Sequence, residues 1–159
     1  MKHVTATSGP EALHPQGCTN FKLRQLMRQV AQHYDAELGK SGLKSTQYSL
    51  LSHVYKLGPL RPGALAAAMK MDASTLTRNL RPLIDAGWLL MTPGADGRSR
   101  QVVLTEAGRA KRQAAQRDWK VAQQRLNAQL GVDRVVALHT LIDDALMCLT
   151  PAAAVPVQG

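Results

Sequence analysis

Cysteine and aromatic residues are scarce in this chain of 159 residues. The two cysteines, Cys18 and Cys148, lie far apart in the sequence, and aromatic residues make up 4% of the chain. Two separated cysteines supply neither a disulfide framework nor the clustered spacing of a zinc site. We therefore expect reduced thiols, no metal, no cofactor, and a core built mainly from Leu, Ala, Val and Met.

Long apolar runs are lacking as well. No uninterrupted apolar segment approaches the roughly 20 residues that a membrane-spanning helix requires. The N-terminal segment MKHVTATSGPEALHPQG has no apolar signal-peptide core. We therefore expect a cytoplasmic protein with no membrane partner.

The motifs of catalysis are also missing. The chain contains no nucleophile elbow, phosphate-binding loop, dinucleotide-binding glycine pattern or HExxH helix. Ser49, His53 and Asp85 have no spacing that indicates a catalytic triad. We therefore predict that the protein is not an enzyme.

Positive charge is what the chain has in excess. Twenty Lys and Arg stand against eleven Asp and Glu, which gives a formal net charge of +9. With 45% hydrophobic and 19% charged residues, the composition is that of a folded protein with affinity for polyanions. Charge alone does not choose among DNA, RNA and an anionic membrane.

Helical periodicity and capping residues divide most of the chain into helices. We expect a helix over residues 19–39 and a second from Ser45 or Thr46, either of which can cap it, to the Gly58-Pro59 pair. A short third helix begins at Pro62. Further helices are predicted for residues 106–130 and 133–150, each with an apolar stripe that packs within one subunit or across a two-fold axis.

Residues 73–105 are the most informative stretch. After a turn at residues 70–72, Asp72 or a neighbour caps an amphipathic helix with Leu76, Leu80 and Leu83 on one face. The other face carries Ser74, Thr75, Arg78, Arg81 and Asp85, with Thr77 between the faces. Such a helix can read DNA with its polar face, or that face can simply be solvated. Pro82 predicts a bend at this point of the helix.

A hairpin follows Gly87. We expect strands over residues 88–92 and 100–105, joined by the loop ProGlyAlaAspGlyArgSer. Arg98 at the tip and Arg100 on the return strand can probe a narrow minor groove. Asp96 would repel phosphate, so we expect it to form a salt bridge with Arg98 or another nearby basic group. The plainer interpretation is a turn-stabilising aspartate with two solvated arginines.

From residue 19 to residue 150 the chain resembles transcription regulators of the MarR family. The most specific segments are AspAlaSerThrLeuThrArg at 72–78, GlyTrpLeu at the strand entry, AspGlyArg at 96–98 and LeuThrGluAlaGly at 104–108. The resemblance implies a mainly α (α+β) winged helix-turn-helix fold with N- and C-terminal dimerisation helices. It also implies a homodimer that binds a pseudo-palindromic operator in double-stranded DNA, usually as a repressor released by a ligand or oxidant.

The resemblance assigns a role to each region. It implies a dimerisation helix at 18–42, a DNA-binding region at 43–108, and linking and dimerisation helices at 109–150. The segments 1–17 and 151–159 lack sustained periodicity, so we expect a flexible N-terminal tail and a C-terminal tail there. The implied place of action is the nucleoid of a bacterial or archaeal cytosol. The expected DNA contacts are Ser45, Thr46, Arg61, Ser74, Thr75, Thr77, Arg78, Arg81, Asp96, Arg98 and Arg100, with Asp96 and Arg98 as the wing-tip pair.

Three functional alternatives remain open. The resemblance implies a small aromatic carboxylate or phenol as the effector, bound in a crevice lined partly by the first two helices, to which His33, Tyr48, Ser49 and His53 could contribute. Alternatively, Cys18 near a helix N-terminus senses oxidants through a reactive thiolate. The basic balance also suits a sequence-independent architectural protein, which would bind promoter and scrambled DNA equally well.

Overall fold

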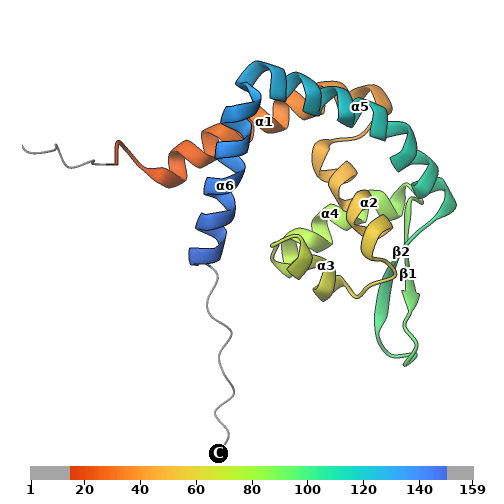
Figure 1. The fold of residues 1–159 in the computed structure, drawn as a ribbon. Helices are drawn as coiled ribbons and strands as arrows, with labels where there is room; N and C mark the ends of the chain where they lie inside the picture. Colours follow the sequence, from red (N-terminus) through yellow and green to blue (C-terminus); the bar gives the residue numbers. More distant parts are fainter. Residues whose placement is uncertain (1–14, 150–159) are drawn as a thin grey trace, which may run out of the picture.

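Helices dominate residues 15–149, the part of the chain that this computed structural model describes (Figure 1). The elements are α1 (Thr19–Leu38), η1 (Gly39–Ser41), α2 (Ser45–Leu57), α3 (Pro62–Ala68), α4 (Ala73–Asp85), β1 (Leu89–Pro93), β2 (Arg100–Leu104), α5 (Glu106–Leu130) and α6 (Val132–Leu149). The predicted mainly α (α+β) winged-helix class is confirmed. The C-terminal tail at 151–159 and all but the end of the N-terminal tail at 1–17 lie outside the described residues.

Local capping explains where most helices begin. The Asp72 carboxylate accepts a hydrogen bond of 2.8 Å from the Thr75 N–H, so Asp72 caps α4 as expected. Pro62 occupies the start of α3, where its missing N–H costs no intrahelical bond. Thr105 caps α5 by accepting from the Gly108 N–H at 2.9 Å. These starts follow from neighbouring residues alone.

The predicted cap of α2 was wrong. Lys44 is the N-cap residue, and the Gln47 side chain accepts a hydrogen bond from its N–H at 2.9 Å. The Ser45 N–H donates instead to the Asp35 carboxylate of α1 at 2.6 Å. The Asp35 carboxylate of α1 therefore satisfies the backbone N–H of Ser45, and neither Ser45 nor Thr46 is the N-cap residue of α2.

One core holds the three short helices and the hairpin together. Leu76, Leu80 and Leu83 are all buried, which confirms the apolar face predicted for α4. They belong to a continuous cluster with residues of α2, α3, β1 and β2. Because burial of these leucines determines the orientation of α4, its opposite face is directed to solvent. The helix continues through Pro82 to Asp85.

The two strands form the wing, which extends from the helical lobe in Figure 1. β1 and β2 are antiparallel, with Leu89 opposite Leu104 and Pro93 opposite Arg100. Leu60 adds an isolated bridge to Val102, so the segment before α3 borders the hairpin. The wing is thereby tied to the start of α3.

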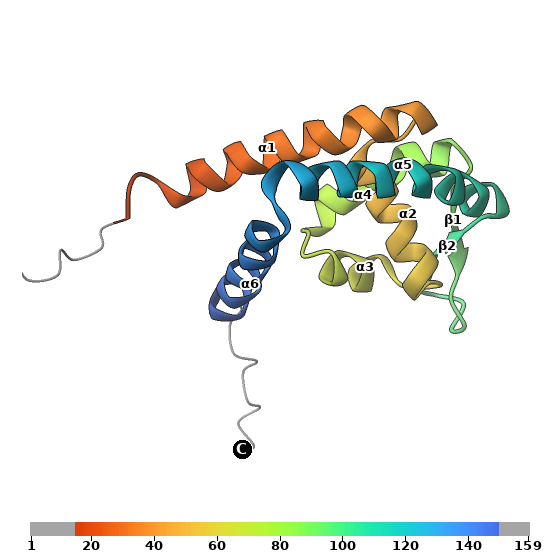
Figure 2. The same ribbon diagram turned by 45° about the horizontal axis from the view of Figure 1, so that its top comes forward.

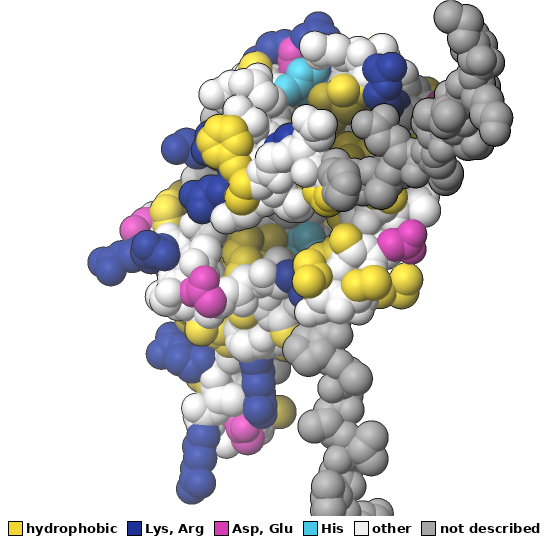
Figure 3. Space-filling view, turned by 90° about the vertical axis from the view of Figure 1, so that its left-hand side faces the viewer, with side chains coloured by type: hydrophobic (Ala, Val, Ile, Leu, Met, Phe, Trp, Pro, Cys, Tyr) yellow, Lys and Arg dark blue, Asp and Glu magenta, His cyan; other side chains and the backbone are white. Residues whose placement is uncertain are grey.

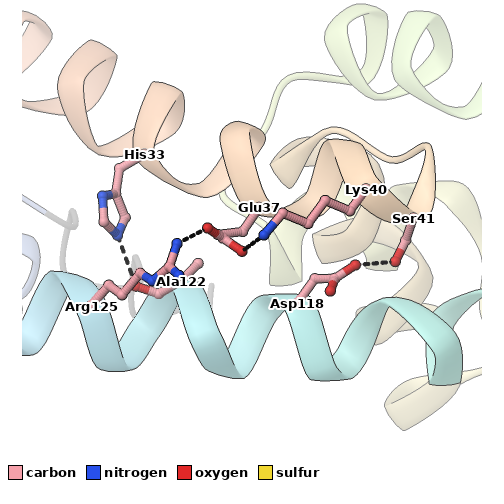
Figure 4. A network of polar contacts seen from close by, with 7 residues as sticks. All are labelled: His33, Glu37, Lys40, Ser41, Asp118, Ala122 and Arg125. Carbon is pink, nitrogen blue, oxygen red and sulfur yellow. Dashed lines mark hydrogen bonds and ion pairs between the residues drawn. The ribbon is translucent and has the colours of Figure 1, made fainter.

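α1 and α5 lie side by side along the other edge of the molecule in both ribbon views (Figures 1 and 2). Figure 4 shows the polar contacts between them: Glu37 pairs with Arg125 of α5, and Ser41 bonds to Asp118. The Lys40 hydrogen bond, with the charge of Arg125, holds the pKa of the Glu37 carboxyl below its ordinary value. These contacts join the end of α1 to the middle of α5.

Candidate nucleic-acid interface

The polar face of α4 carries three hydrogen-bonded hydroxyls and one guanidinium group without a described carboxylate partner. The Asp72 carboxylate accepts from the Ser74 hydroxyl at 2.6 Å and from the Thr75 hydroxyl at 2.7 Å. The Thr77 hydroxyl donates to the Ala73 carbonyl at 2.8 Å. Each of these three hydroxyls would therefore have to leave its internal acceptor to donate to DNA, whereas its oxygen can still accept from a DNA donor.

Arg78 is the cation on this face that is most available. No described carboxylate forms an ion pair with it, and its weak contact is a 3.4 Å hydrogen bond to the Thr75 hydroxyl. Arg81, one turn away, lies 3.9 Å from the Asp85 carboxylate. Arg78 therefore presents its donors to an external acceptor with less competition than Arg81 does.

Hydrogen bonds keep the Asp72 carboxylate ionised at the start of α4. The Ser74 hydroxyl makes the largest contribution, followed by the Thr75 hydroxyl and N–H, and together they hold the pKa of Asp72 well below its usual range. An ionised carboxylate is favourable at the positive end of a helix dipole. It therefore stabilises the first turn of α4, which carries Ser74 and Thr75.

The tip of the wing is built around Asp96. One of its carboxylate oxygens accepts from the Ser99 hydroxyl at 2.6 Å, the Ser99 N–H at 2.8 Å and the Arg98 N–H at 3.1 Å. These bonds, with the Ser99 hydroxyl first, hold the pKa of Asp96 below its ordinary value. Gly97 adopts a φ of +66°, which suits glycine in this tight turn.

The predicted salt bridge of Asp96 with a nearby basic group is confirmed, but that group is not the Arg98 side chain, so the predicted Asp96–Arg98 pair was wrong. The other Asp96 oxygen lies 3.1 Å from the guanidinium of Arg61, at the start of α3. Arg98 contributes its backbone N–H only, and among the described residues its guanidinium has no carboxylate partner. The partner of Asp96 comes from 35 residues away in sequence, because the start of α3 borders the wing.

Arg98 and Arg100 are exposed on this hairpin. In Figure 3, dark blue Lys and Arg side chains project from the lower end of the molecule, which is the end where the wing lies in Figure 1. Since α4 and the wing belong to one core, Arg78 and Arg98 are held in a defined relation to each other. The arrangement of α4 and the wing is suited to contact one DNA duplex, with α4 in the major groove and the wing beside it.

Ser45 and Thr46, two further predicted DNA contacts, lie at the start of α2. The Ser45 N–H is bonded to Asp35 of α1, and Ser45 lines a crevice between helices. Thr46 is its exposed neighbour. DNA contact by these two residues stays a prediction.

The root of the wing is attached closely to α5. The Thr105 hydroxyl lies 2.7 Å from the Gly87 carbonyl oxygen and 3.1 Å from that of Trp88, while it accepts from the Gly108 N–H. A Cβ added to Gly108 would lie 2.8 Å from the Trp88 carbonyl carbon and would overlap its oxygen. Glycine is therefore required where α5 crosses the start of β1.

A crevice of about 540 Å³ lies between α1, α2 and α5. Of the four residues predicted to bind an effector, Tyr48, Ser49 and His53 line it. His33 does not: its Nε2 bonds to the Ala122 carbonyl at 2.9 Å, and its ring lines a different hollow between α1 and α5. The placement of His33 in the crevice was therefore wrong.

Several residues of the crevice were missed from sequence because they come from α5. The Trp119 ring stacks on Tyr48, with centroids 6.0 Å apart, and the Arg112 guanidinium lies 4.2 Å from the centre of the Tyr55 ring. The Arg112 Nε donates to the Ser52 hydroxyl at 3.3 Å. Trp119 lies in the helix predicted over residues 106–130, but no local signal paired it with α2.

Both cysteines are exposed. Cys18 is the N-cap residue of α1, as its predicted place near a helix start requires, and Cys148 lies at the end of α6. Redox sensing through Cys18 stays a prediction.

Residues 15–149 contain neither a membrane-spanning helix nor a metal-binding cluster. None of the helices there has both the length and the apolar character needed to cross a bilayer. Over the same span, no three His, Cys, Asp or Glu side chains are grouped so as to hold a metal ion.

Comparison with known proteins places this geometry in a family. Residues 43–99 match the model of the MarR family. YwoH, an uncharacterized HTH-type transcriptional regulator of Bacillus subtilis (strain 168), is 30% identical over 90 residues, which are 57% of this chain and 66% of that protein. The match therefore spans just under two thirds of that regulator.

Two crystal structures share the fold. The transcriptional regulator MosR of M. tuberculosis, solved in complex with DNA, is 33% identical, with a TM-score of 0.70 over 84% of this chain and 100% of that one. A probable transcriptional regulator from Pseudomonas aeruginosa is 26% identical, with a TM-score of 0.73 over 80% and 96% of the two chains. The chain therefore belongs to the MarR family, whose members are DNA-binding transcriptional regulators and not enzymes.

Proposed function

We propose that this protein is a repressor that binds a pseudo-palindromic operator as a homodimer in the cytosol and leaves it when a small aromatic effector binds. The observation that carries the DNA contact is the pair Arg78 and Arg98, both without a described carboxylate partner, on two elements of one core. MosR, a relative that shares the fold, has been solved with DNA bound.

The test of operator binding is a titration against promoter DNA and a scrambled duplex at two salt concentrations. We expect the promoter to bind about 10³-fold or more tightly than the scrambled duplex, because base contacts add to the phosphate term. Both affinities should fall as salt rises, since binding releases counterions. Equal affinity for the two duplexes would support the architectural alternative and remove the regulator proposal.

The proposed dimer interface consists of the apolar faces of α1 and α6. Within one chain, Val135 is the buried residue of α6, while Leu141 is 67% and Met147 71% exposed. On α1, Phe21 and Met27 are likewise more than half exposed. An apolar groove of about 400 Å³ runs between α1, α5 and α6, and yellow side chains gather beside these helices in Figure 3. Exposed apolar side chains that gather on one surface support its role as an interface.

A second copy of the chain is the occupant that this surface fits. The groove is lined mostly by apolar residues of α1, α5 and α6, with Gln123 and His139 among them. Helices with apolar stripes fill such grooves by packing side chains between one another. A two-fold axis through the apolar faces of α1 and α6 would place two α4 helices in one assembly. A pseudo-palindromic operator presents the same half-site twice, so it matches that symmetry.

Leu141→Asp should convert the dimer to a monomer, because a charge would be desolvated in the apolar interface. Sedimentation velocity is expected to show about half the wild-type mass at micromolar concentration. Leu57→Asp is the matched control: Leu57 is 50% exposed on α2, outside the proposed interface, and its variant should stay dimeric. A dimeric Leu141→Asp variant would show that the interface lies elsewhere.

The crevice between α1, α2 and α5 suits a planar anion. Arg112 and Lys56 line it, and no Asp or Glu is among its lining residues. The stacked rings of Tyr48 and Trp119 provide a flat wall. An aromatic carboxylate or phenolate would satisfy both features, with its ring on the wall and its charge at a cation.

Coupling to DNA follows from the position of α5. This helix lines the crevice with Arg112 and Trp119 and holds the wing root through Gly108. An effector that binds one arrangement of α5 better than another would shift the spacing of the two wings in the dimer. By linkage, DNA that prefers the other arrangement would weaken effector binding by the same factor.

Benzoate and phenol are suitable first probes, and Ser49→Leu should abolish their effect by filling the crevice. A ligand that binds only the folded protein stabilises it by about 2.7 kcal/mol at one hundred times its Kd, and the melting temperature rises as a result. Thr46→Leu, an exposed position on the same helix outside the crevice lining, is the control and should respond like wild type. Equal thermal shifts in wild type and Ser49→Leu would place the ligand elsewhere.

A further inference from the structure

A smaller hollow adjoins the effector crevice near the root of the wing. Its volume is about 190 Å³, and it is lined by Tyr55, Arg109, Arg112, Gln113 and Gln116. It shares Tyr55, Arg112 and Gln116 with the crevice, whereas Arg109 and Gln113 line the hollow and not the crevice. All five side chains carry hydrogen-bond donors, and none of them is a carboxylate.

Two guanidinium groups meet over one aromatic ring in this hollow. The Arg109 guanidinium lies 5.3 Å and that of Arg112 4.2 Å from the centre of the Tyr55 ring. Residues three apart on a helix are neighbours, so α5 presents both groups on the same side of the hollow. Stacking on an aromatic face restricts a guanidinium to one orientation and leaves the donors at its edge free.

The partners of these two cations neutralise them only in part. Arg112 forms no ion pair with a described carboxylate, and its Nε donates to the Ser52 hydroxyl. The Arg109 Nε lies 3.7 Å from the carboxylate of Glu106, whose side chain is 91% exposed. Like charges held close together repel one another unless an anion lies between them. The hollow is therefore complementary to a multiply charged anion.

We propose that Arg109 and Arg112 form a binding site for the phosphoryl group of a small molecule that is neither the aromatic effector nor DNA, with Arg112 shared between this site and the effector crevice. A phosphoryl group offers three acceptor oxygens and up to two charges, which match the paired forks of two guanidinium groups. The carboxamides of Gln113 and Gln116 add neutral donors around the same space.

The site lies at the other end of the wing from Arg98. Arg109 and Arg112 are in the first two turns of α5, at the root of the wing, whereas Arg98 is at the tip of the hairpin (Figure 1). Occupancy would neutralise two charges on α5 beside the crevice. A phosphorylated ligand would therefore compete with an aromatic anion for Arg112.

Isothermal titration of the full chain with pyrophosphate, in the absence of DNA, tests the site. We expect one saturable binding event per chain, weakened tenfold or more in Arg109→Gln. Arg117→Gln, which removes an exposed charge from α5 outside this hollow, and Arg98→Gln at the wing tip should both bind pyrophosphate as wild type does. Absence of saturable binding, or equal weakening in the three variants, would overturn the proposal as diffuse attraction.

Operator affinity separates the two sources of a phosphoryl group. For a small-molecule site, Arg109→Gln should leave operator affinity and its salt dependence unchanged. A uniform loss of affinity with a shallower salt slope would instead identify the phosphates of the DNA backbone as the ligand and overturn the small-molecule assignment. Because the pyrophosphate titration contains no DNA, its result does not depend on the proposed operator binding.

Discussion

Replacing Gly108 with alanine should destabilise the protein by about 1–3 kcal/mol, the usual cost of forcing extra volume into a packed site. The new Cβ would lie 2.8 Å from the Trp88 carbonyl carbon and 2.9 Å from the Leu104 Cδ1. The obstacle includes backbone, so no side-chain rotation relieves it. Urea unfolding followed by circular dichroism should show a lower midpoint with an unchanged slope.

Gly63→Ala is the matched control. Gly63 lies in α3, and nothing stands within 4 Å of the Cβ that alanine would add. Alanine restricts the unfolded chain more than glycine does, so this variant should be as stable as wild type or slightly more stable. Equal unfolding midpoints for Gly108→Ala and wild type would contradict the close crossing of α5 and β1.

Gly108→Ala should also weaken DNA binding. Gly108 donates to Thr105, whose hydroxyl joins the carbonyls of Gly87 and Trp88 at the wing root. If α5 moves away from Trp88 to admit a methyl group, the wing shifts relative to α4 although every arginine is still present. This loss should appear in the folded fraction, at temperatures well below the melting transition.

Arg78→Ala should lower operator affinity about 10- to 100-fold, corresponding to the roughly 1–3 kcal/mol of a good base contact. Arg78, on the face opposite Leu76 and Leu80, has no described carboxylate partner and makes one long hydrogen bond to the Thr75 hydroxyl. Because it would read bases, the variant should also lose part of its preference for promoter over scrambled DNA. Fluorescence anisotropy with both duplexes measures the two effects together.

Arg98→Ala should behave differently. A wing-tip guanidinium that contacts the backbone contributes equally to all duplexes, so affinity should fall uniformly and the salt slope should decrease by about one. Arg117→Ala on the exposed face of α5 is the control for loss of one positive charge. Unchanged affinity in both Arg78→Ala and Arg98→Ala would show that α4 and the wing are not the DNA-binding surface.

Local sequence was sufficient to predict the helices and the hairpin. The period of Leu76, Leu80 and Leu83 defined the buried face of α4, and Asp72 defined its start, because helix caps and amphipathic stripes depend on residues within a turn or two. The strands at 88–92 and 100–105 were placed within one residue of β1 and β2 at each end. These predictions depended on contacts close along the chain.

Contacts between distant elements were not predictable in the same way. Asp96 pairs with Arg61 and not with the Arg98 side chain, and the Ser45 N–H bonds to Asp35. Each of these partners was an ordinary charged residue on another element. Their selection depends on how the elements approach in space, which no periodicity encodes.

The sequence by itself determined the elements, the polar face of α4 and the family of the chain, since these depend on residue types at short spacing. Tertiary structure decided which residues meet. Asp96 at the wing tip pairs with Arg61, and Ser45 lines the crevice. Arg112 and Trp119 of α5 contact residues of α2. The physical reason is that a buried leucine stripe specifies which face of a helix is covered. The element that covers it, and the polar groups that arrive with that element, depend on the packing of the whole core.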